Sequence, residues 1–472
     1  MTIRSTVNVV FHDARVIDPL LGRDGVGDVV VLDGIIVERP GEVPAGCVHV
    51  DCRGLVIAPA FVDLHCHLRE PGFEEKETVA SGTAAAAAGG FGVVCCMPNT
   101  RPPLDSAARA DAFSEIVRRD ARVRVLPIAA VTLGRRGQAL VDIRALASAG
   151  VAGFSDDGDY VADTVVMRDA LSQAMGLGLP VIDHAQDGRL VAGGVLNEGH
   201  VARRLKLRGM PAEAEELAVA RNIALARLTG GHVHIAHITT ARAVEMVRRA
   251  RNEGVWVTAE VAPHHMLLTD DDAMMLDSTG VPRFVNQAKV NPPLRTRDDV
   301  AAVVRGVSEG VIDAIATDHA PHTLEDKSGS PGEAAFGISV FETALASALT
   351  ASEQTDLSLA RVVHCLTAGP AAVLKEGMVR PCLEPGSPAS LVLFDPETKW
   401  TVDVSRFLSK GRNTPLEGRT LRGRVVATFV DGSCAFVSDS VSGERTGQRM
   451  LNPDGGDAVD PLPDIPNATQ ER

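Results

Sequence analysis

Residues 63–72 read D-L-H-C-H-L-R-E-P-G and directly follow the apolar run 55–62. Alternate residues of a β-strand point to the same side, so His65 and His67 leave the end of this strand together, close enough to bind one metal ion. Arg69 follows two residues later, in position to bind an anion. A His-x-His pair is also compatible with two buried strand histidines, and His232 and His234 form a second pair. The stretch therefore predicts a metal-binding strand end, provided that other ligands converge on it.

The chain beyond this stretch alternates short apolar runs with segments of helical periodicity. Eight strands that alternate with helices are typical of a (β/α)8 barrel, whose functional groups lie at the C-terminal ends of the strands. The expected strands are 56–64, 92–97, 123–131, 152–155, 180–183, 232–237, 256–262 and 312–317. The clearest helix candidates are 77–88, 106–119, 165–176, 212–229, 241–252 and 298–309. We therefore expect an α/β fold with a TIM-like barrel over residues 57–375.

Both ends of the chain are rich in short β-type runs separated by turns. Residues 1–56 and 376–437 have this character, and we expect them to pack together as one small, discontinuous β-sandwich domain. The tail at 438–472 is rich in Gly, Asp, Pro and Ser and has few apolar residues. Such a composition cannot bury a core, so the tail is expected to be disordered.

The composition of the 472 residues is that of a soluble globular protein, with 45% hydrophobic and 23% charged residues. Only 3% are aromatic, so Val, Leu, Ile and Ala must fill the core. A formal net charge of -14 argues against non-specific nucleic-acid binding, which needs basic patches. The same charge means that any site for an anion must be built locally.

Cysteine spacing and the N-terminus predict a cytoplasmic protein. The eight cysteines include no C-x-x-C pair, which favours reduced thiols over a disulfide framework. The N-terminal residues lack the apolar segment of a signal peptide, and no apolar run is long enough to span a membrane.

Polar residues of the metal-binding type follow four further strands of the expected barrel. Asp157, His184, His237 and Asp318 come at the ends of the fourth, fifth, sixth and eighth runs. Each has an alternative explanation taken alone: either histidine could lie in the core, and either aspartate could belong to a turn or a helix N-cap. Because the strand ends of a barrel meet at one mouth, all four should join His65 and His67 there, as a pair of zinc ions would require. The pair His264-His265 ends the seventh strand and is assigned no ligand role.

Several motifs together resemble those of type I dihydroorotases of the amidohydrolase superfamily. They are H-C-H-L-R-E-P-G at 65–72, M-P-N-T at 97–100, S-D-D-G at 155–158, A-E-V-A-P-H-H at 259–265, N-P-P-L-R at 291–295, A-T-D-H-A-P-H at 316–322, F-G-I at 336–338 and F-L-S-K-G-R-N-T-P at 407–415. The resemblance extends over nearly the whole chain up to residue 437. It implies a zinc-dependent enzyme that interconverts N-carbamoyl-L-aspartate and L-dihydroorotate in pyrimidine (UMP) biosynthesis.

The resemblance also implies a role for individual residues. It assigns one zinc ion to His65, His67 and Asp318, a second to His184 and His237, and the bridging position to Asp157. Asp318 would be the catalytic proton carrier as well. The implied substrate contacts are Arg69, Asn99 and His322 for the carboxylate, and Asn291 with the backbone of Phe336 and Gly337 for the ring.

Two other functions are compatible with parts of this pattern. One is a different cyclic amidase, an allantoinase or hydantoinase; against it, the related hydantoinases bridge their metals with a carboxylated lysine, where this chain has Asp157. The other is a non-catalytic subunit that scaffolds aspartate carbamoyltransferase; against it, all six expected ligands are present. For a dihydroorotase, the resemblance implies a homodimer or an association with aspartate carbamoyltransferase as partners to be tested.

Two further features concern the surroundings of the site. Many relatives carry an acidic residue at the position of Gln186, close to His184. The segment 324–335, L-E-D-K-S-G-S-P-G-E-A-A, lies between His322 and Phe336 and is rich in Gly, Ser and Pro. It could be a mobile loop that closes over substrate or a passive surface loop.

Overall fold

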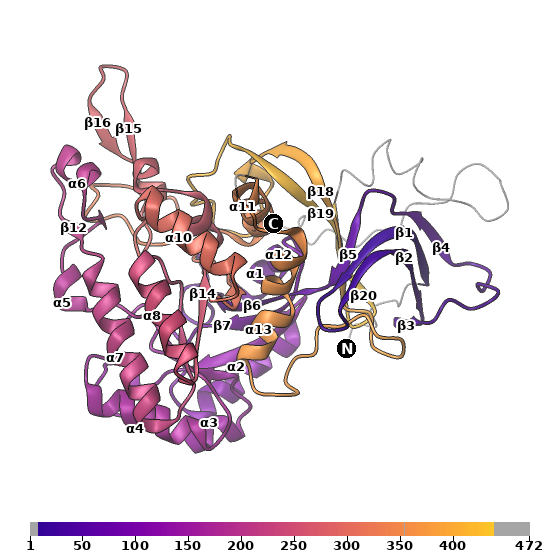
Figure 1. Cartoon of the computed structure of the whole chain (residues 1–472), viewed down its shortest axis with the longest axis horizontal. Helices are drawn as coiled ribbons and strands as arrows, with labels where there is room; N and C mark the ends of the chain where they lie inside the picture. Colours follow the sequence, from indigo (N-terminus) through magenta and orange to yellow (C-terminus); the bar gives the residue numbers. More distant parts are fainter. Residues whose placement is uncertain (1–7, 354, 439–472) are drawn as a thin grey trace.

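The computed structural model describes residues 8–353 and 355–438. Figure 1 shows two parts side by side: a barrel surrounded by helices on the left, and a β-sheet domain on the right. Apart from Ser438, the tail that was expected to be disordered lies outside the described residues. Within the described ranges, no helix is both long and apolar enough to cross a membrane.

Eight parallel strands form the barrel in the order β17-β14-β13-β10-β9-β8-β7-β6. They are β6 (Phe61–Cys66), β7 (Phe91–Cys96), β8 (Arg124–Ala129), β9 (Gly153–Phe154), β10 (Val181–Asp183), β13 (Val233–Ile235), β14 (Val257–Val261) and β17 (Ala314–Ile315). A bridge from Cys66 to His319, just beyond β17, connects the two ends of this sheet. Each predicted run supplies one barrel strand, and the predicted (β/α)8 fold is confirmed.

Helices follow the barrel strands and cover the outside of the barrel (Figure 1). They are α1 (Val79–Ala88), α2 (Ala107–Asp120), α3 (Ile143–Ser148), α4 (Thr164–Met175), α7 (Glu213–Thr229), α8 (Ala241–Asn252), α10 (Arg297–Ser308), α11 (Ala344–Ser352), α12 (Leu359–Leu366) and α13 (Ala368–Val373). The side chains of Thr78, Asp163, Thr240 and Thr296 accept backbone N–H groups in the first turns of α1, α4, α8 and α10. These N-caps explain why the helices begin where the sequence predicted them.

Shorter elements lie in the connections. They are α5 (Gly188–Val191), β11 (Leu196–Asn197), α6 (His200–Leu205), β12 (Gly209–Met210), α9 (Pro263–Leu267), β15 (Met274–Leu276), β16 (Pro282–Phe284) and the 3-10 turns η1 (Leu133–Arg135), η2 (Asp270–Ala273), η3 (Asn286–Ala288), η4 (Phe341–Thr343) and η5 (Val404–Arg406). The hairpin of β15 and β16 projects from the barrel at the upper left of Figure 1.

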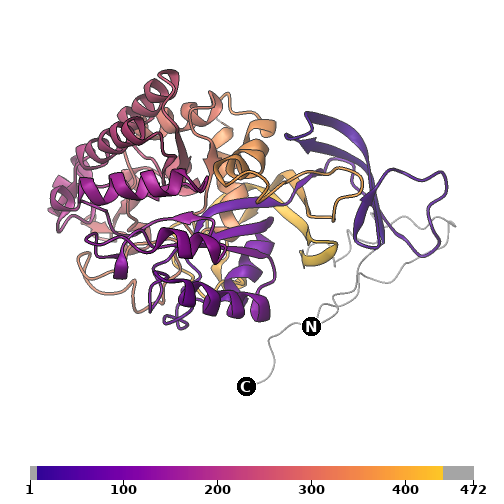
Figure 2. The same cartoon turned by 90° about the horizontal axis from the view of Figure 1, so that it is seen from below.

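The β-sheet domain combines both ends of the chain, as predicted. It contains β1 (Val9–Asp18), β2 (Arg23–Leu32), β3 (Ile35–Val37), β4 (Val48–Asp51) and β5 (Val56–Pro59), together with β18 (Leu391–Thr401), β19 (Thr420–Val430) and β20 (Ser433–Val437). All eight are hydrogen-bonded into one sheet, in which β5 and β18 pair antiparallel and join the two halves. Figure 2 shows this domain beside the barrel from a second direction.

The run 56–64, expected as a single strand, is two strands in different sheets. β5 pairs with β1 and β18 in the sheet domain, whereas β6 pairs with β7 in the barrel, and only Ala60 separates them. All residues from Leu55 to Leu68 are buried, so no change in hydrophobicity marks the point where the chain passes from one sheet to the other. The domain limits drawn at 56/57, 375/376 and 437/438 stay predictions.

Aliphatic side chains fill the barrel. One buried cluster includes Leu64, Cys95, Ile128, Ile182 and Ala314, which come from five different barrel strands. A cluster with members all around the ring is the packed interior that such a barrel requires. This packing leaves the polar residues at the C-terminal strand ends as the functional face.

Candidate active site

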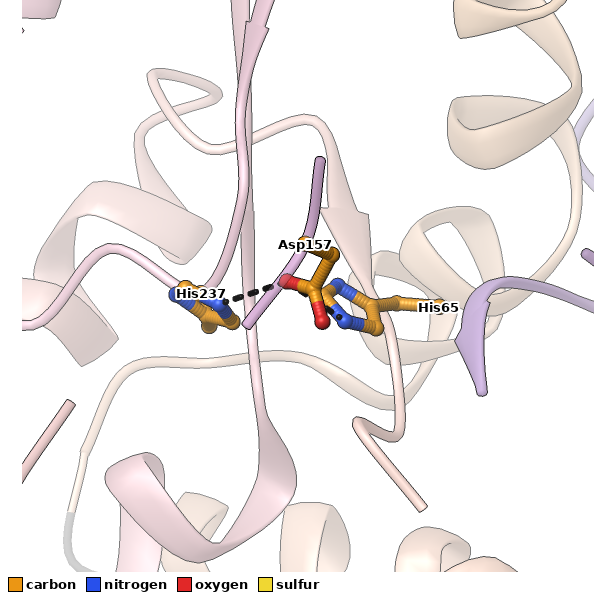
Figure 3. Close-up of side chains that lie close together, drawn as sticks. All are labelled: His65, Asp157 and His237. Atoms are coloured by element: carbon orange, nitrogen blue, oxygen red, sulfur yellow. Dashed lines mark ion pairs between the residues drawn. The ribbon is translucent and has the colours of Figure 1, made fainter. Parts of the chain in front are cut away.

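The six expected metal ligands meet at the C-terminal ends of the barrel strands. All are buried, with exposures of 0% for His65, 4% for His67, 3% for Asp157, 4% for His184, 2% for His237 and 6% for Asp318. Figure 3 shows three of them, with the carboxylate of Asp157 between the imidazoles of His65 and His237. The tertiary structure thus brings together residues that are up to 253 positions apart in the chain, from His65 to Asp318.

Asp157 lies at the centre of this cluster. Its Oδ1 is 3.2 Å from Nε2 of His65, 3.5 Å from Nε2 of His237 and 3.6 Å from Nδ1 of His184. Its second oxygen, Oδ2, is 3.5 Å from Nε2 of His67. A carboxylate that faces imidazoles on both sides has the position of a ligand shared between two metal ions.

Two overlapping groups of side chains have the spacing of a metal site. In the first, Nε2 of His67 and Nε2 of His65 lie 3.2 and 3.6 Å from Oδ1 of Asp318. The second contains His65, Asp157 and His237. His184 adjoins the second group, since its Nδ1 is 3.0 Å from Nε2 of His237. Two ring nitrogens at that distance need a proton or a cation between them.

The donor set fits a bound metal ion of the zinc type. Nε2 of His65 and Oδ1 of Asp157 are buried and have no hydrogen-bond partner among the described residues. Leaving such atoms unsatisfied is costly, and a metal ion would satisfy both at once. Imidazole nitrogens and carboxylate oxygens are the ligands that zinc accepts.

The charges in the cluster are complementary. Burial raises the pKa of Asp157, but the neighbouring His65, His184 and His237 lower it well below its usual range. Burial also raises the pKa of Asp318, but His67, His65 and His237 have the larger effect and lower it below its usual range. Both aspartates are therefore carboxylates at neutral pH, as metal binding requires.

The backbone is strained at three positions of this mouth. Arg69, His237 and Asp318 have φ angles of 63°, 32° and 47°, values that residues other than glycine adopt infrequently. Strain of this kind is found where the surrounding structure holds a functional side chain in one direction. Here it accompanies two expected ligands and the expected anion-binding arginine.

Glu260 orients one of the expected ligands and was not identified from the sequence. Its Oε1 accepts a hydrogen bond of 2.8 Å from Nδ1 of His65, so that Nε2 of His65 faces the cluster. Its Oε2 accepts a second bond of 3.1 Å from Nε2 of His234. The signal in the sequence was an acidic residue inside the apolar run 256–262.

This contact also explains the second His-x-His pair. Nδ1 of His234 lies 2.8 Å from Oγ1 of Thr258, and Nε2 of His232 lies 2.7 Å from the same hydroxyl. His232 and His234 therefore extend a polar chain that begins at His65, and neither is part of the two groups that have the spacing of a metal site.

Asp63 joins the first and last barrel strands beneath the cluster. Its carboxylate accepts hydrogen bonds from the backbone N–H and the hydroxyl of Thr317, both at 2.7 Å. Thr317 immediately precedes Asp318, so this contact holds the strand of His65 and the strand of Asp318 in register. Burial raises the pKa of Asp63 to about 7.

The residues expected to bind the substrate carboxylate lie next to the cluster of expected ligands. Oδ1 of Asn99 accepts a hydrogen bond of 2.9 Å from Nδ1 of His67. Nη2 of Arg69 is 3.3 Å from Nε2 of His322, and Nε of Arg69 donates to the carbonyl of Pro321. His322 is neutral, because burial and the charges of Arg69 and two lysines lower its pKa to about 3.

The two expected ring contacts are engaged within the protein. Asn291 donates to Oε1 of Gln186 at 2.9 Å and lies 3.1 Å from Nε2 of His184. The carbonyl of Phe336 accepts from Nε2 of His322 at 2.8 Å, and the N–H of Gly337 donates to the carbonyl of Lys289 at 2.9 Å. Gln186 thus holds Asn291 against His184, an expected metal ligand.

His264 and His265 are buried beside the cluster. Nε2 of His265 donates to the carbonyl of Pro292 at 3.0 Å, whereas neither ring nitrogen of His264 has a partner among the described residues. Burial lowers the pKa of His264 to about 4, so this imidazole is neutral. The absence of an assigned ligand role for this pair stays a prediction.

Comparison with known proteins gives the same family from two directions. The family described as Dihydro-orotase-like matches residues 54–243. The dihydroorotase of Anaeromyxobacter dehalogenans strain 2CP-1 is 44% identical over 431 residues, covering 90% of this chain and 97% of that protein. The dihydroorotase of Pelotomaculum thermopropionicum is 45% identical over 428 residues, covering 90% and 98%.

Solved structures share the fold at much lower identity. L-hydantoinase (dihydropyrimidinase) from Arthrobacter aurescens superposes with a TM-score of 0.77 at 23% identity, covering 91% of this chain and 96% of that one. Dihydropyrimidinase from Brevibacillus agri gives a TM-score of 0.77 at 21% identity, covering 91% and 95%. These likenesses establish the barrel and its companion sheet and nothing more specific.

Proposed function

This chain belongs to the dihydroorotase family, and on that premise we propose that it catalyses the reversible cyclisation of N-carbamoyl-L-aspartate to L-dihydroorotate in pyrimidine (UMP) biosynthesis. The enzyme is a cyclic amide hydrolase with dihydroorotase function, as its similarity to curated dihydroorotases over about 90% of the chain indicates. The motif pattern supports the type I subgroup within the family.

The observation that carries the proposal is the buried cluster in which four imidazoles surround Asp157 and two of them also face Asp318. Enzymes of this kind depend on metal, and we propose two zinc ions. His65, His67 and Asp318 would hold one, His184 and His237 would hold the other, and Asp157 would bridge them. The unpartnered, buried atoms Nε2 of His65 and Oδ1 of Asp157 support this assignment.

Zinc at this site would supply Lewis acidity toward the amide carbonyl and a water molecule of lowered pKa. Asp318 is ionised and lies within 3.6 Å of both His65 and His67, so it can take a proton from the attacking water. The same carboxyl group can then deliver that proton to the departing ring nitrogen. In the cyclising direction it would remove a proton from the ureido nitrogen.

The substrate carboxylate would bind to Arg69, Asn99 and His322. The guanidinium of Arg69 can form two parallel hydrogen bonds to a carboxylate, which orients the substrate and neutralises its charge. Its Nε donates to the carbonyl of Pro321 and its Nη2 lies 3.3 Å from Nε2 of His322, so the protein holds the guanidinium beside another expected carboxylate contact. Asn291 would contact the ring after exchanging its hydrogen bond to Gln186 for one to the substrate. The Phe336–Gly337 backbone would contact the ring from its present position, held by His322 and Lys289.

A hydantoinase or allantoinase is the alternative that the fold alone permits. Two features support dihydroorotase: Asp157 occupies the position where hydantoinases are expected to have a carboxylated lysine, and Arg69 lies 3.3 Å from His322, a pair that would suit a substrate carboxylate and that a neutral ring would not need. We further propose a cytoplasmic enzyme, since all eight cysteines are free. A homodimer and an association with aspartate carbamoyltransferase are proposed as possible assemblies.

The deciding experiment is hydrolysis of L-dihydroorotate by the purified chain, first loaded with zinc and then after chelation. We expect turnover that disappears with the metal and returns when zinc is restored. Hydantoin and allantoin serve as comparison substrates and should turn over far more slowly. Preferred turnover of a neutral ring would replace the proposed function, and activity that appears only with added aspartate carbamoyltransferase would establish a required partner.

A further inference from the structure

Two buried lysines hold the segment 324–335 that follows His322. Lys289 and Lys327 are only 2% and 3% exposed. Lysine is seldom buried this deeply, because its ammonium group must be paired or saturated with hydrogen bonds. None of the metal-binding, catalytic or substrate-binding roles proposed above is assigned to these two lysines.

Lys327 saturates its three N–H bonds with backbone carbonyls. Its Nζ donates to the carbonyls of Lys289 at 3.0 Å, Ala335 at 2.9 Å and Gly337 at 3.0 Å. These carbonyls belong to two separate stretches, the one that leads into Asn291 and the one that contains Phe336 and Gly337. Lys327 therefore fastens together the two stretches that are expected to contact the substrate ring.

Lys289 holds the same segment from the other side. Its Nζ donates to the carbonyls of Pro331 at 2.6 Å, Gly332 at 3.3 Å and Ala334 at 2.5 Å, and it lies 4.3 Å from the centre of the Phe336 ring. The two lysines thus bind five backbone carbonyls between Pro331 and Gly337, and Lys327 binds the carbonyl of Lys289 as a sixth. The sequence left open whether segment 324–335 is a mobile loop that closes over substrate or a passive loop. These hydrogen bonds favour a loop that stays in place.

Lys327 also contributes charge at the anion end of the site. Its positive charge is among those that lower the pKa of His322, together with Arg69 and Lys76. In a protein with a net charge of -14, these cations add positive charge beside His322, and the carboxylate of Asp326, 3.2 Å from Nζ of Lys76, offsets part of it.

We propose that Lys327 is a positioning residue for the substrate carboxylate, which acts by fixing the Phe336–Gly337 backbone beside His322 and by adding positive charge to that pocket. The inference deepens the proposed function and rests on it. It predicts that loss of the ammonium group weakens substrate binding more than it slows the chemical step.

The pH dependence follows from the same geometry. Burial lowers the pKa of Lys327 to about 7, whereas His322 and Asp326, which lie next to it, have pKa values of about 3 and about 2. Lys289 is the other neighbouring group whose pKa burial lowers. Lys327 therefore loses its charge as the pH rises through 7, while His322 and Asp326 keep their charge states.

The test compares Lys327→Met, Lys289→Met and the exposed control Lys375→Met with the wild type, all loaded with zinc. For Lys327→Met we expect KM for L-dihydroorotate at pH 6.5 to rise by about tenfold, with kcat and metal content within about twofold of the wild type. KM of the wild type and of Lys289→Met should rise between pH 6 and 8.5, and KM of Lys327→Met should not. Lys375→Met should match the wild type.

Lys327→Met should fold, because the carbonyls of Lys289 and Gly337 each keep a second donor, the N–H of Gly337 and Nδ2 of Asn413. Hydrogen exchange on the wild type gives a measurement that needs no variant: the amides of Ala335 and Gly337 should be slow to exchange without ligand and change little with N-carbamoyl-L-aspartate. If these amides became strongly protected only with ligand, the segment would be a mobile lid and the inference would be overturned. An unchanged KM in Lys327→Met would overturn it as well, whereas an inactive wild type would count against the proposed function instead.

Discussion

Nδ1 of His65 donates a hydrogen bond to Glu260 across 2.8 Å, and this contact fixes which nitrogen of the imidazole faces the site. Glu260 is 1% exposed, and it also accepts from His234. Burial opposes its ionisation, but the two histidines lower its pKa to about 2, so it is a carboxylate at neutral pH. A carboxylate behind a metal-binding histidine orients the ring and increases its basicity.

Replacing that carboxylate should weaken metal binding. For Glu260→Gln we expect zinc affinity to fall by about 10- to 100-fold, with activity partly restored by excess zinc. Competition with a chelator of known affinity measures the change. Glu245→Gln, on the exposed face of α8, is the control and should bind zinc as the wild type does. An unaltered affinity in Glu260→Gln would remove Glu260 from this role.

Arg69→Lys keeps the positive charge but loses the planar pair of donors. We expect KM for L-dihydroorotate to rise by about 10- to 100-fold, the equivalent of about 1.5–3 kcal/mol for hydrogen bonds to a charged group, with zinc content unchanged. Steady-state kinetics and metal analysis of the same preparation separate the two effects. Arg168→Lys, in an exposed pair with Asp169, is the matched control. Wild-type Michaelis behaviour in Arg69→Lys would argue against the assignment.

Asp318→Asn should abolish turnover to within the limit of the assay. An amide cannot carry the proton from water to the ring nitrogen, and general acid–base catalysis contributes roughly 10²–10⁴-fold. Because Asp318 is also an expected ligand, zinc content must be determined in the variant. If a fully zinc-loaded Asp318→Asn enzyme kept more than a trace of activity, another group would have to carry the proton.

Stability should depend on pH through Glu342, which lies outside the metal cluster. Burial raises the pKa of Glu342 to about 8, although it accepts hydrogen bonds from the backbone N–H groups of Leu408 and Ser409. A group that binds its proton more tightly in the folded state stabilises the protein below its ordinary pKa, and this contribution is lost as the pH rises toward the folded value. Wild-type stability should therefore fall between about pH 5 and pH 8.

The comparison is with Glu342→Gln, which has no proton to lose. At about 1.4 kcal/mol per pKa unit, the wild type should lose a few kcal/mol relative to this variant over that range. Thermal unfolding followed by circular dichroism at a series of pH values measures the difference, with the exposed Glu38→Gln as control. Parallel pH profiles for wild type and Glu342→Gln would show that the folded pKa of Glu342 is not raised.

The local sequence determined the barrel strands and most of their helices. The apolar runs 91–96 and 257–261 form buried strands, and helix starts such as Thr78 and Asp163 carry their own capping side chains. The expected ligands could be predicted from the sequence for a related reason. The strand ends of a barrel meet at one mouth, so a polar residue that directly follows an apolar run points there.

Contacts between segments that are distant in the chain decided the features that the local sequence did not predict. Nothing near Ala60 marks the change from one sheet to the other, because β5 and β6 are equally buried. Glu260 gained its role only when β14 placed it behind His65, 195 residues away in the chain. Lys327 lies in a Gly-, Ser- and Pro-rich segment that is typical of an exposed loop, yet the fold surrounds its ammonium group with carbonyls from two other stretches. Periodicity and spacing report on neighbours in the chain, whereas hydrogen bonds of this kind depend on where the completed fold brings donors and acceptors together.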